Sequence, residues 1–118
     1  MQKVLIFDDN EEILLVMEMI LSDAGYSVFT RTDVNTVIQA VEETQPDVVI
    51  MDNNIPDHGG ILASQQIKSK AEHQHIPIIF CTSSDRIKAL AEQAKAQTSL
   101  NKPFDIDTLL DTVKACLA

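Results

Sequence analysis

The stretch VVIMDNNIPDHGG, residues 48–60, runs four apolar residues directly into Asp52 and continues into a polar turn containing Pro and Gly. A second stretch, VLIFDDN at residues 4–10, ends an apolar run in the same way, on Asp8 and Asp9. A short, wholly apolar run bounded by turn residues is typical of a buried strand. The two stretches therefore predict two buried strands that each end in a carboxylate.

Apolar runs of this kind alternate along the chain with segments of helical periodicity. Further strands are predicted at residues 26–30, at the edge of the sheet, and at 76–81 and 98–100. Between them, helices are predicted from their apolar stripes and capping residues. These expectations include caps at Asn10, Asp33 and Asp105, a stop at Gly25, and inward positions at Ile13, Met17, Ile20, Leu21, Ala24 and Ile106.

Strict alternation of strands and helices determines the fold class. Strands that are apolar on both faces belong to a parallel sheet covered by helices on both sides. Right-handed crossovers then favour a doubly wound α/β sheet. The chain has 118 residues, so we expect a single domain spanning residues 1–118.

Composition narrows the classes of partner. The formal net charge is −9 and no basic stripe is present, which argues against direct binding to nucleic acid or to anionic membranes. The two cysteines do not make a disulfide framework, and no stretch resembles a signal peptide or a membrane span. We therefore expect a cytoplasmic protein.

Polar groups follow most of the predicted strands, at the sheet edge where ligands bind in this architecture. Carboxylates that converge there repel one another, so a cation is expected among them. Mg²⁺ suits a site made of few carboxylates and a phosphate oxygen, and an aspartate can serve as a nucleophile toward phosphorus. The sequence thus predicts a site for Mg²⁺ and a phosphoryl group, built from Asp8, Asp9, Asp52, Thr82 and Lys102.

Four stretches together resemble the receiver domain of bacterial response regulators. They are VLIFDDN, DVVIMDNNIPDHGG, IPIIFCTSS and NKPF, which occur in the family's order and at its spacing. The resemblance covers the whole chain. It implies a flavodoxin-like (βα)5 fold whose five parallel strands have the order 2-1-3-4-5.

The resemblance also implies roles for individual residues. Asp52 matches the phosphoryl acceptor, and Mg²⁺ would be held by Asp8, Asp9, Asp52 and the backbone carbonyl of Asn54. The switch and phosphoryl contacts would be Thr82, Ser83 and Lys102, and Pro103 would support the lysine loop, often through a cis peptide bond. Ser99 stands where many receivers carry an aromatic residue, and Asn54 and Ser84 occupy the positions that tune dephosphorylation.

The implied function is that of a signalling switch. A histidine kinase or histidine phosphotransfer protein would donate a phosphoryl group to Asp52, and the change would reach the face formed by the fourth helix, fifth strand and fifth helix. An output domain or protein would read that face, with the chain a monomer or a phosphorylation-dependent dimer. Two alternatives remain: a phosphohydrolase, disfavoured because Asn54 stands where a general acid is needed, and a scaffold that binds partners without phosphorylation.

Overall fold

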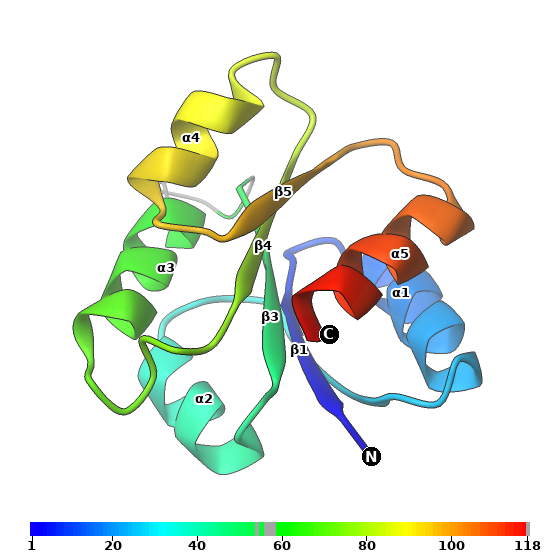
Figure 1. Ribbon diagram of the computed structural model, residues 1–118, viewed down its shortest axis with the longest axis horizontal. Coiled ribbons are helices and arrows are strands. Elements are labelled where there is room, and N and C mark those ends of the chain that lie inside the picture. The colour runs from blue at the N-terminus through cyan, green and yellow to red at the C-terminus, as the bar shows by residue number, and fades with distance from the viewer. Residues whose placement is uncertain (54, 56–58, 118) are drawn as a thin grey trace.

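The computed structural model describes residues 1–53, 55 and 59–117. In this part of the chain, strands run through the middle of the molecule between two groups of helices (Figure 1). The elements are, in order, β1 (Lys3–Phe7), α1 (Glu11–Asp23), β2 (Ser27–Arg31), α2 (Val37–Thr44), β3 (Val48–Asp52), α3 (Gly59–Ser69), β4 (Ile78–Thr82), α4 (Ile87–Gln93), β5 (Thr98–Asn101) and α5 (Ile106–Leu117).

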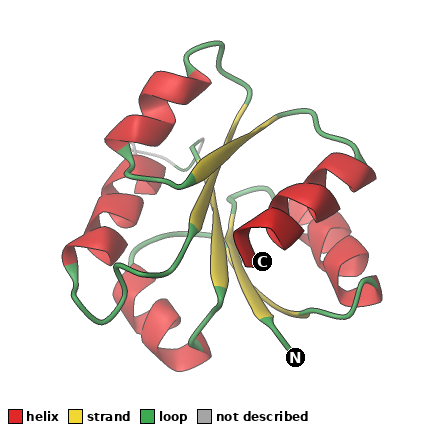
Figure 2. Ribbon diagram, viewed as in Figure 1, coloured by secondary structure: helices red, strands yellow, loops and turns green. Residues whose placement is uncertain are grey.

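The strands form one parallel sheet in the order β2-β1-β3-β4-β5. Helices α1 and α5 cover one face, and α2, α3 and α4 cover the other (Figures 1 and 2). The doubly wound fold and the strand order expected from the sequence are confirmed, including the edge position of β2. The order reverses between β1 and β3, so the carboxyl ends of these two strands meet at the switch point of the topology.

The core lies in two layers because each buried strand alternates its side chains between the two faces. In β1, Val4 and Ile6 pack toward α1 and α5, whereas Leu5 and Phe7 pack toward α2 and α3. Both faces are covered, so the strand shows no polar alternation in the sequence. Each aliphatic side chain buried in this way stabilises the fold by roughly 1.5–3 kcal/mol.

Helix α1 begins and ends at the residues that the sequence indicates. The side chain of Asn10 accepts hydrogen bonds from the backbone N–H groups of Glu12 and Ile13, and Gly25 terminates the helix with φ +101°. Its buried face is formed by Leu14, Met17 and Leu21. The expectation that Ala24 faces inward is wrong, since the helix has ended there and the residue is exposed.

Two further expectations about helix ends are corrected. Asp33 does not cap α2: its carboxylate accepts a hydrogen bond from Asn35 N at 3.0 Å, and the helix starts later, at Val37. The Asp33 carboxylate is thus used in a local turn before the helix, as is common for aspartate side chains. Ile106 is 56% exposed rather than inward-facing: it is the first residue of α5, and the buried face of that helix is formed by Leu109 and Val113, which come later.

Strands β3 and β4 extend to the polar residues that follow their apolar runs. Asp52 is the last residue of β3, and Thr82 is the last residue of β4. Conversely, Ile76 and Pro77 precede β4, although the apolar pattern suggested a strand from residue 76. In the described part of the chain, none of the helices combines the length and the apolar character that a membrane crossing requires.

Candidate functional site

Three carboxylates converge at the carboxyl ends of β1 and β3. Phe7 of β1 pairs with Met51 of β3, so the residues that follow them, Asp8 and Asp52, lie next to each other at the strand ends. One oxygen from each of Asp8, Asp9 and Asp52 lies within 4.8 Å of the other two. Asp8 and Asp52 are only 2% and 1% exposed, whereas Asp9 is exposed. The cluster is therefore open to solvent on one side and closed on the other.

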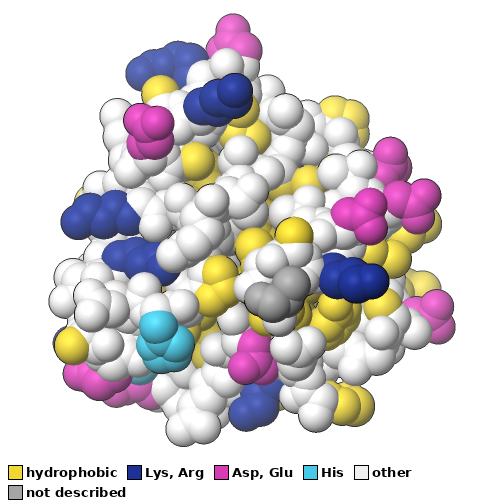
Figure 3. Space-filling model, viewed as in Figure 1, with side chains coloured by type: hydrophobic (Ala, Val, Ile, Leu, Met, Phe, Trp, Pro, Cys, Tyr) yellow, Lys and Arg dark blue, Asp and Glu magenta, His cyan; other side chains and the backbone are white. Residues whose placement is uncertain are grey.

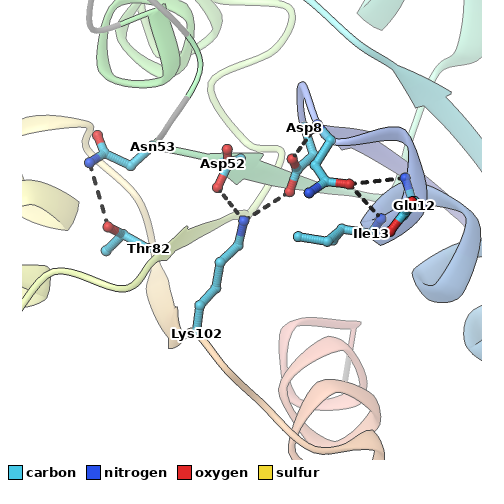
Figure 4. Close-up of polar contacts among 8 residues, drawn as sticks. Asp8, Glu12, Ile13, Asp52, Asn53, Thr82 and Lys102 are labelled. Atoms are coloured by element: carbon cyan, nitrogen blue, oxygen red, sulfur yellow. Dashed lines mark hydrogen bonds and ion pairs between the residues drawn. The ribbon is translucent and has the colours of Figure 1, made fainter.

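Lys102 enters the cluster from the loop that follows β5. Its Nζ lies 2.6 Å from Asp52 Oδ1 and 3.0 Å from Asp8 Oδ2 (Figure 4). The loop is held by a hydrogen bond from Lys102 N to Thr82 O, and the peptide bond between Lys102 and Pro103 is cis. Burial alone lowers the pKa of Lys102, but the hydrogen bonds to Asp52 and Asp8, together with the negative charges of these carboxylates, outweigh it and raise the pKa. The ammonium therefore stays charged at neutral pH.

Helix α1 anchors the Asp8 carboxylate. Asn10 N donates to Asp8 Oδ1 at 2.9 Å, and Asp8 N donates to Arg31 O at 3.1 Å. The side chain of Asn10 meanwhile caps α1. The residue that starts the helix thus also fixes one carboxylate of the site, so the geometry of the cluster depends on the packing of α1.

The charges and oxygens of this cluster fit a divalent cation. Three carboxylates and one ammonium group carry three negative charges and one positive charge, which leaves the cluster formally two charges negative. Such an excess is unfavourable in a partly buried site unless a cation offsets it. Carboxylate oxygens are the ligands that Mg²⁺ and Ca²⁺ take. The predicted contribution of Asn54 lies outside the described residues.

The Thr82 hydroxyl lies next to the acidic cluster and takes part in two hydrogen bonds. Its Oγ1 accepts from Asn53 Nδ2 at 3.5 Å and from Ser84 N at 3.2 Å, and Thr82 is 1% exposed. In Figure 4, Thr82 lies on the side of Asp52 away from Asp8. Sequence reasoning identified Thr82 and Ser84 but not Asn53. The sequence did offer one indication of Asn53: it directly follows Asp52, the last residue of the strand next to β4.

The remaining predicted residues surround the site without joining the cluster. Ser83 is exposed and lines a surface groove beside Lys102 and Pro103. Ser99 is half-buried in β5, where it pairs with Phe80 of β4. Cys81 is a core residue, and burial raises the pKa of its thiol to about 12. The thiol is therefore protonated and unreactive although it is close to the carboxylates.

Gly60 allows α3 to approach the end of β3. A Cβ atom built on Gly60 would overlap the backbone carbonyl oxygen of Asp52. A Cβ on the neighbouring Gly59 would instead meet side-chain atoms, 2.9 Å from Val34 Cγ2 and 3.1 Å from Ile55 Cγ2. The first contact is with rigid backbone and the second with side chains that can move. Gly60 thus helps to set where Asp52 lies.

An apolar groove of about 500 Å³ opens next to Lys102, between α1 and the loop after β5. Val16 and Phe104 belong both to this groove and to a neighbouring hollow that also includes Met19 and Ile106. Val16, Met19 and Ile106 are 53%, 64% and 56% exposed. Apolar and acidic side chains lie side by side over α1 and α5 (Figure 3). An exposed apolar surface of this kind is typical of a protein contact.

Comparison with known proteins identifies the family. The profile of the response regulator receiver domain matches residues 4–114. The chain belongs to this family. The receiver resemblance predicted from four sequence stretches is thereby confirmed, and the site described above lies where the receiver architecture places its ligands, at the carboxyl ends of the central strands.

Individual relatives agree in sequence and in structure. Protein PilH of Pseudomonas aeruginosa is 32% identical over 120 residues, which cover 100% of this chain and 99% of PilH. The CAI-1 autoinducer sensor kinase/phosphatase CqsS of Vibrio cholerae is 33% identical over 117 residues, 97% of this chain but only 17% of that protein. The structure of the Vibrio cholerae chemotaxis protein CheY4 superimposes with a TM-score of 0.90 at 31% identity, covering 99% of both chains.

Proposed function

We propose that residues 1–118 form one receiver domain whose phosphoryl acceptor is Asp52. Receivers are signalling switches rather than classical enzymes, and this chain is a member of that family. The observation that carries the assignment is the placement of Asp52: its carboxylate is 1% exposed, lies at a strand end, and is bonded to Lys102 Nζ at 2.6 Å. A buried carboxylate with a fixed cation beside it is suited to react with an incoming phosphoryl group.

In the proposed reaction, a carboxylate oxygen of Asp52 attacks the phosphorus of a phosphohistidine. The new O–P bond forms as the P–N bond breaks, and the electron pair of the broken bond goes to the imidazole nitrogen of the donor. The product is an acyl phosphate on Asp52. Lys102 is close enough to pair with an oxygen of the transferred group, and the Thr82 hydroxyl would donate to another oxygen. Hydrolysis then restores the carboxylate, at a rate tuned by Asn54 and Ser84.

Asp8, Asp9 and Asp52 are the residues that would hold Mg²⁺, together with Asn54. Their oxygens are close enough to share one ion, and their negative charge exceeds what Lys102 offsets. A bound Mg²⁺ would offset the charge that gathers on the phosphoryl oxygens during transfer. Asp8 is pre-oriented for this role by Asn10 N, and Asp9 is exposed to solvent.

The proposed donor is a histidine kinase or a histidine phosphotransfer protein. One relative, CqsS, is named as a sensor kinase/phosphatase and contains a region similar to this chain. The groove between α1 and the loop after β5 gives such a donor a surface that leads directly to Lys102. The phosphorylated state would be read on the α4–β5–α5 face by an output domain or protein. Cytoplasmic location, and a monomer or phosphorylation-dependent dimer, stay predictions.

Intact mass after incubation with Mg²⁺ and a small acyl-phosphate donor tests the assignment. One added phosphoryl group is expected in the original protein and none in Asp52→Asn. Asp111→Asn removes the same charge from an exposed position of α5 and should still be modified. An unmodified original protein, sampled before hydrolysis can erase the adduct, would refute the proposal and favour a scaffold that acts without phosphorylation.

A further inference from the structure

The side chain of Asn53 lies against the hydroxyl of Thr82, one residue beyond the proposed acceptor. Asn53 Nδ2 is 3.5 Å from Thr82 Oγ1, and Figure 4 shows the pair beside Asp52, on the side away from Asp8. Asn53 is half-buried and Thr82 is 1% exposed. The contact is therefore partly shielded from competing water.

The register of the sheet brings these two side chains together. Asp52 pairs with Cys81, and Asn53 N donates to Cys81 O at 2.9 Å, which continues the ladder by one residue beyond β3. Asn53 thus stands opposite Thr82 on the neighbouring strand. Successive side chains of a strand point to opposite faces, so Asn53 and Thr82 share the face that Asp52 does not use.

Two donors hold the Thr82 oxygen in this position. Besides Asn53 Nδ2, the backbone N–H of Ser84 donates to Oγ1 at 3.2 Å. The Ser84 bond is formed within the loop after β4, so it travels with Thr82 if that loop moves. The Asn53 bond joins Thr82, the last residue of β4, to the residue that follows β3. It is the one of the two that must break when Thr82 moves relative to Asp52.

We propose that Asn53 is a positioning residue that restrains Thr82 in the unphosphorylated protein. The Asn53 amide donates to the Thr82 oxygen, whereas a phosphoryl oxygen would accept from the Thr82 O–H, so the two oppose each other through the position of the Thr82 side chain. The Asn53 bond thus shifts the equilibrium toward the resting arrangement. This inference rests on the proposed function, in which Thr82 turns toward a phosphoryl group on Asp52. The bond is long, so its removal should change the equilibrium by roughly two- to tenfold, in keeping with a single neutral hydrogen bond.

Beryllofluoride with Mg²⁺, a stand-in for the phosphoryl group, provides the test. Asn53→Leu removes the amide donor at similar volume and should bind beryllofluoride roughly two- to tenfold more tightly by calorimetry. Asn53→Gln keeps an amide donor and should stay near the original affinity. The Thr82 methyl resonance of free Asn53→Leu should also shift toward its position in the beryllofluoride complex, a signal that a general loss of stability would not produce.

Two backgrounds separate a restraint on the hydroxyl from a packing effect. In Thr82→Ser the hydroxyl remains, so Asn53→Leu should still tighten binding. In Thr82→Val the hydroxyl is gone, so the effect of Asn53→Leu should vanish. An unchanged or weaker affinity of Asn53→Leu, or an effect that persists in Thr82→Val, would overturn the inference. Asn53→Ala repeats the comparison if the leucine variant folds poorly.

The same titration distinguishes this inference from the function on which it rests. If the original protein neither binds beryllofluoride nor gains a phosphoryl group, the assignment of Asp52 fails and the restraint fails with it. If the original protein binds but Asn53→Leu binds equally well, Asp52 stands as acceptor and only the role of Asn53 is refuted.

Discussion

At the scale of single residues, the site depends on which atoms surround one buried carboxylate. The ammonium group of Lys102 pairs with the Asp52 carboxylate. Gly60 leaves room for the backbone of Asp52, which any side chain at position 60 would overlap. The two glycines at the start of α3 are not equivalent. Gly59 faces side chains of Val34 and Ile55, which can adjust, whereas Gly60 faces backbone, which cannot.

Gly60→Ala should therefore destabilise the protein and slow phosphorylation. Overpacking against backbone costs on the order of 1–3 kcal/mol, and the displaced Asp52 should react more slowly with a small acyl phosphate. Denaturant unfolding and the rate of adduct formation measure the two effects. Gly59→Ala is the matched control and should be milder in both. Equal losses in the two variants, or no loss in Gly60→Ala, would contradict this account of α3.

At the scale of elements, the first residues of α1 and α5 are held by side-chain caps close to the site. Asn10 caps α1 and fixes Asp8, so the start of this helix and the metal site share one residue. Asp105 likewise caps α5, since its carboxylate accepts a hydrogen bond from Thr108 N at 2.7 Å. Both caps lie at the sheet edge that carries the acidic cluster.

The Asp105 cap should make the stability of α5 depend on pH. The hydrogen bond from Thr108 N lowers the pKa of Asp105 below the ordinary value of an aspartate. A carboxyl group whose pKa is lower in the folded state contributes stability above the unfolded pKa and loses it as pH falls through the folded pKa. The original protein should thus exceed Asp105→Asn in denaturant midpoint at about pH 6, and the gap should narrow progressively as pH falls below about 4, the ordinary pKa of an aspartate. A gap that does not change with pH would exclude a charged cap.

The apolar groove beside α1 should serve the protein donor and not the chemistry itself. Val16→Asp puts a charge on the groove wall, so transfer from a phosphohistidine protein should slow by roughly tenfold, the effect of one moderately important interface residue. Phosphorylation by a small acyl phosphate should be unchanged. Leu15→Asp is the control, since Leu15 is 59% exposed on the same helix but does not line the groove. Equal slowing by the two variants would place the donor elsewhere.

At the scale of the whole molecule, the excess of negative charge couples the site to stability. The chain carries a formal charge of −9, and the cluster at the sheet edge concentrates part of it on two neighbouring strands. A cation that binds only the folded arrangement stabilises the fold through mass action. Binding at the carboxyl ends of β1 and β3 should therefore be visible in the unfolding of the entire domain.

Mg²⁺ should raise the unfolding temperature more than NaCl at the same ionic strength. At a concentration one hundred times its dissociation constant, a ligand of the native state adds about 2.7 kcal/mol. Asp9→Asn should weaken this response with little change in the metal-free protein, because Asp9 is exposed. Asp111→Asn should leave the response intact. If Mg²⁺ and NaCl stabilise the protein equally, the cluster does not bind the ion specifically.

Features that depend on neighbours along the chain could be predicted from the amino-acid sequence. Apolar runs predicted buried strands, Asn10 and Asp105 predicted helix starts, and the polar residues that follow the strands predicted the acidic cluster and Lys102. The strand order came from the resemblance to the receiver family. The convergence of Asp8, Asp9 and Asp52 followed because the carboxyl ends of parallel strands meet at one edge. Apart from the strand order, each inference used a local pattern or a rule of topology.

Features that depend on contacts between distant segments became apparent when the segments were seen packed together. The late start of α2 depends on the local turn at Asp33. The outward position of Ile106 depends on where α5 begins relative to the buried layer. The contact of Asn53 with Thr82 depends on strand register. A shift of one residue in register would move Asn53 to the opposite face while leaving the apolar pattern of β4 unchanged. The chemistry of the site was therefore visible in the sequence, but the restraint on its switch residue was not.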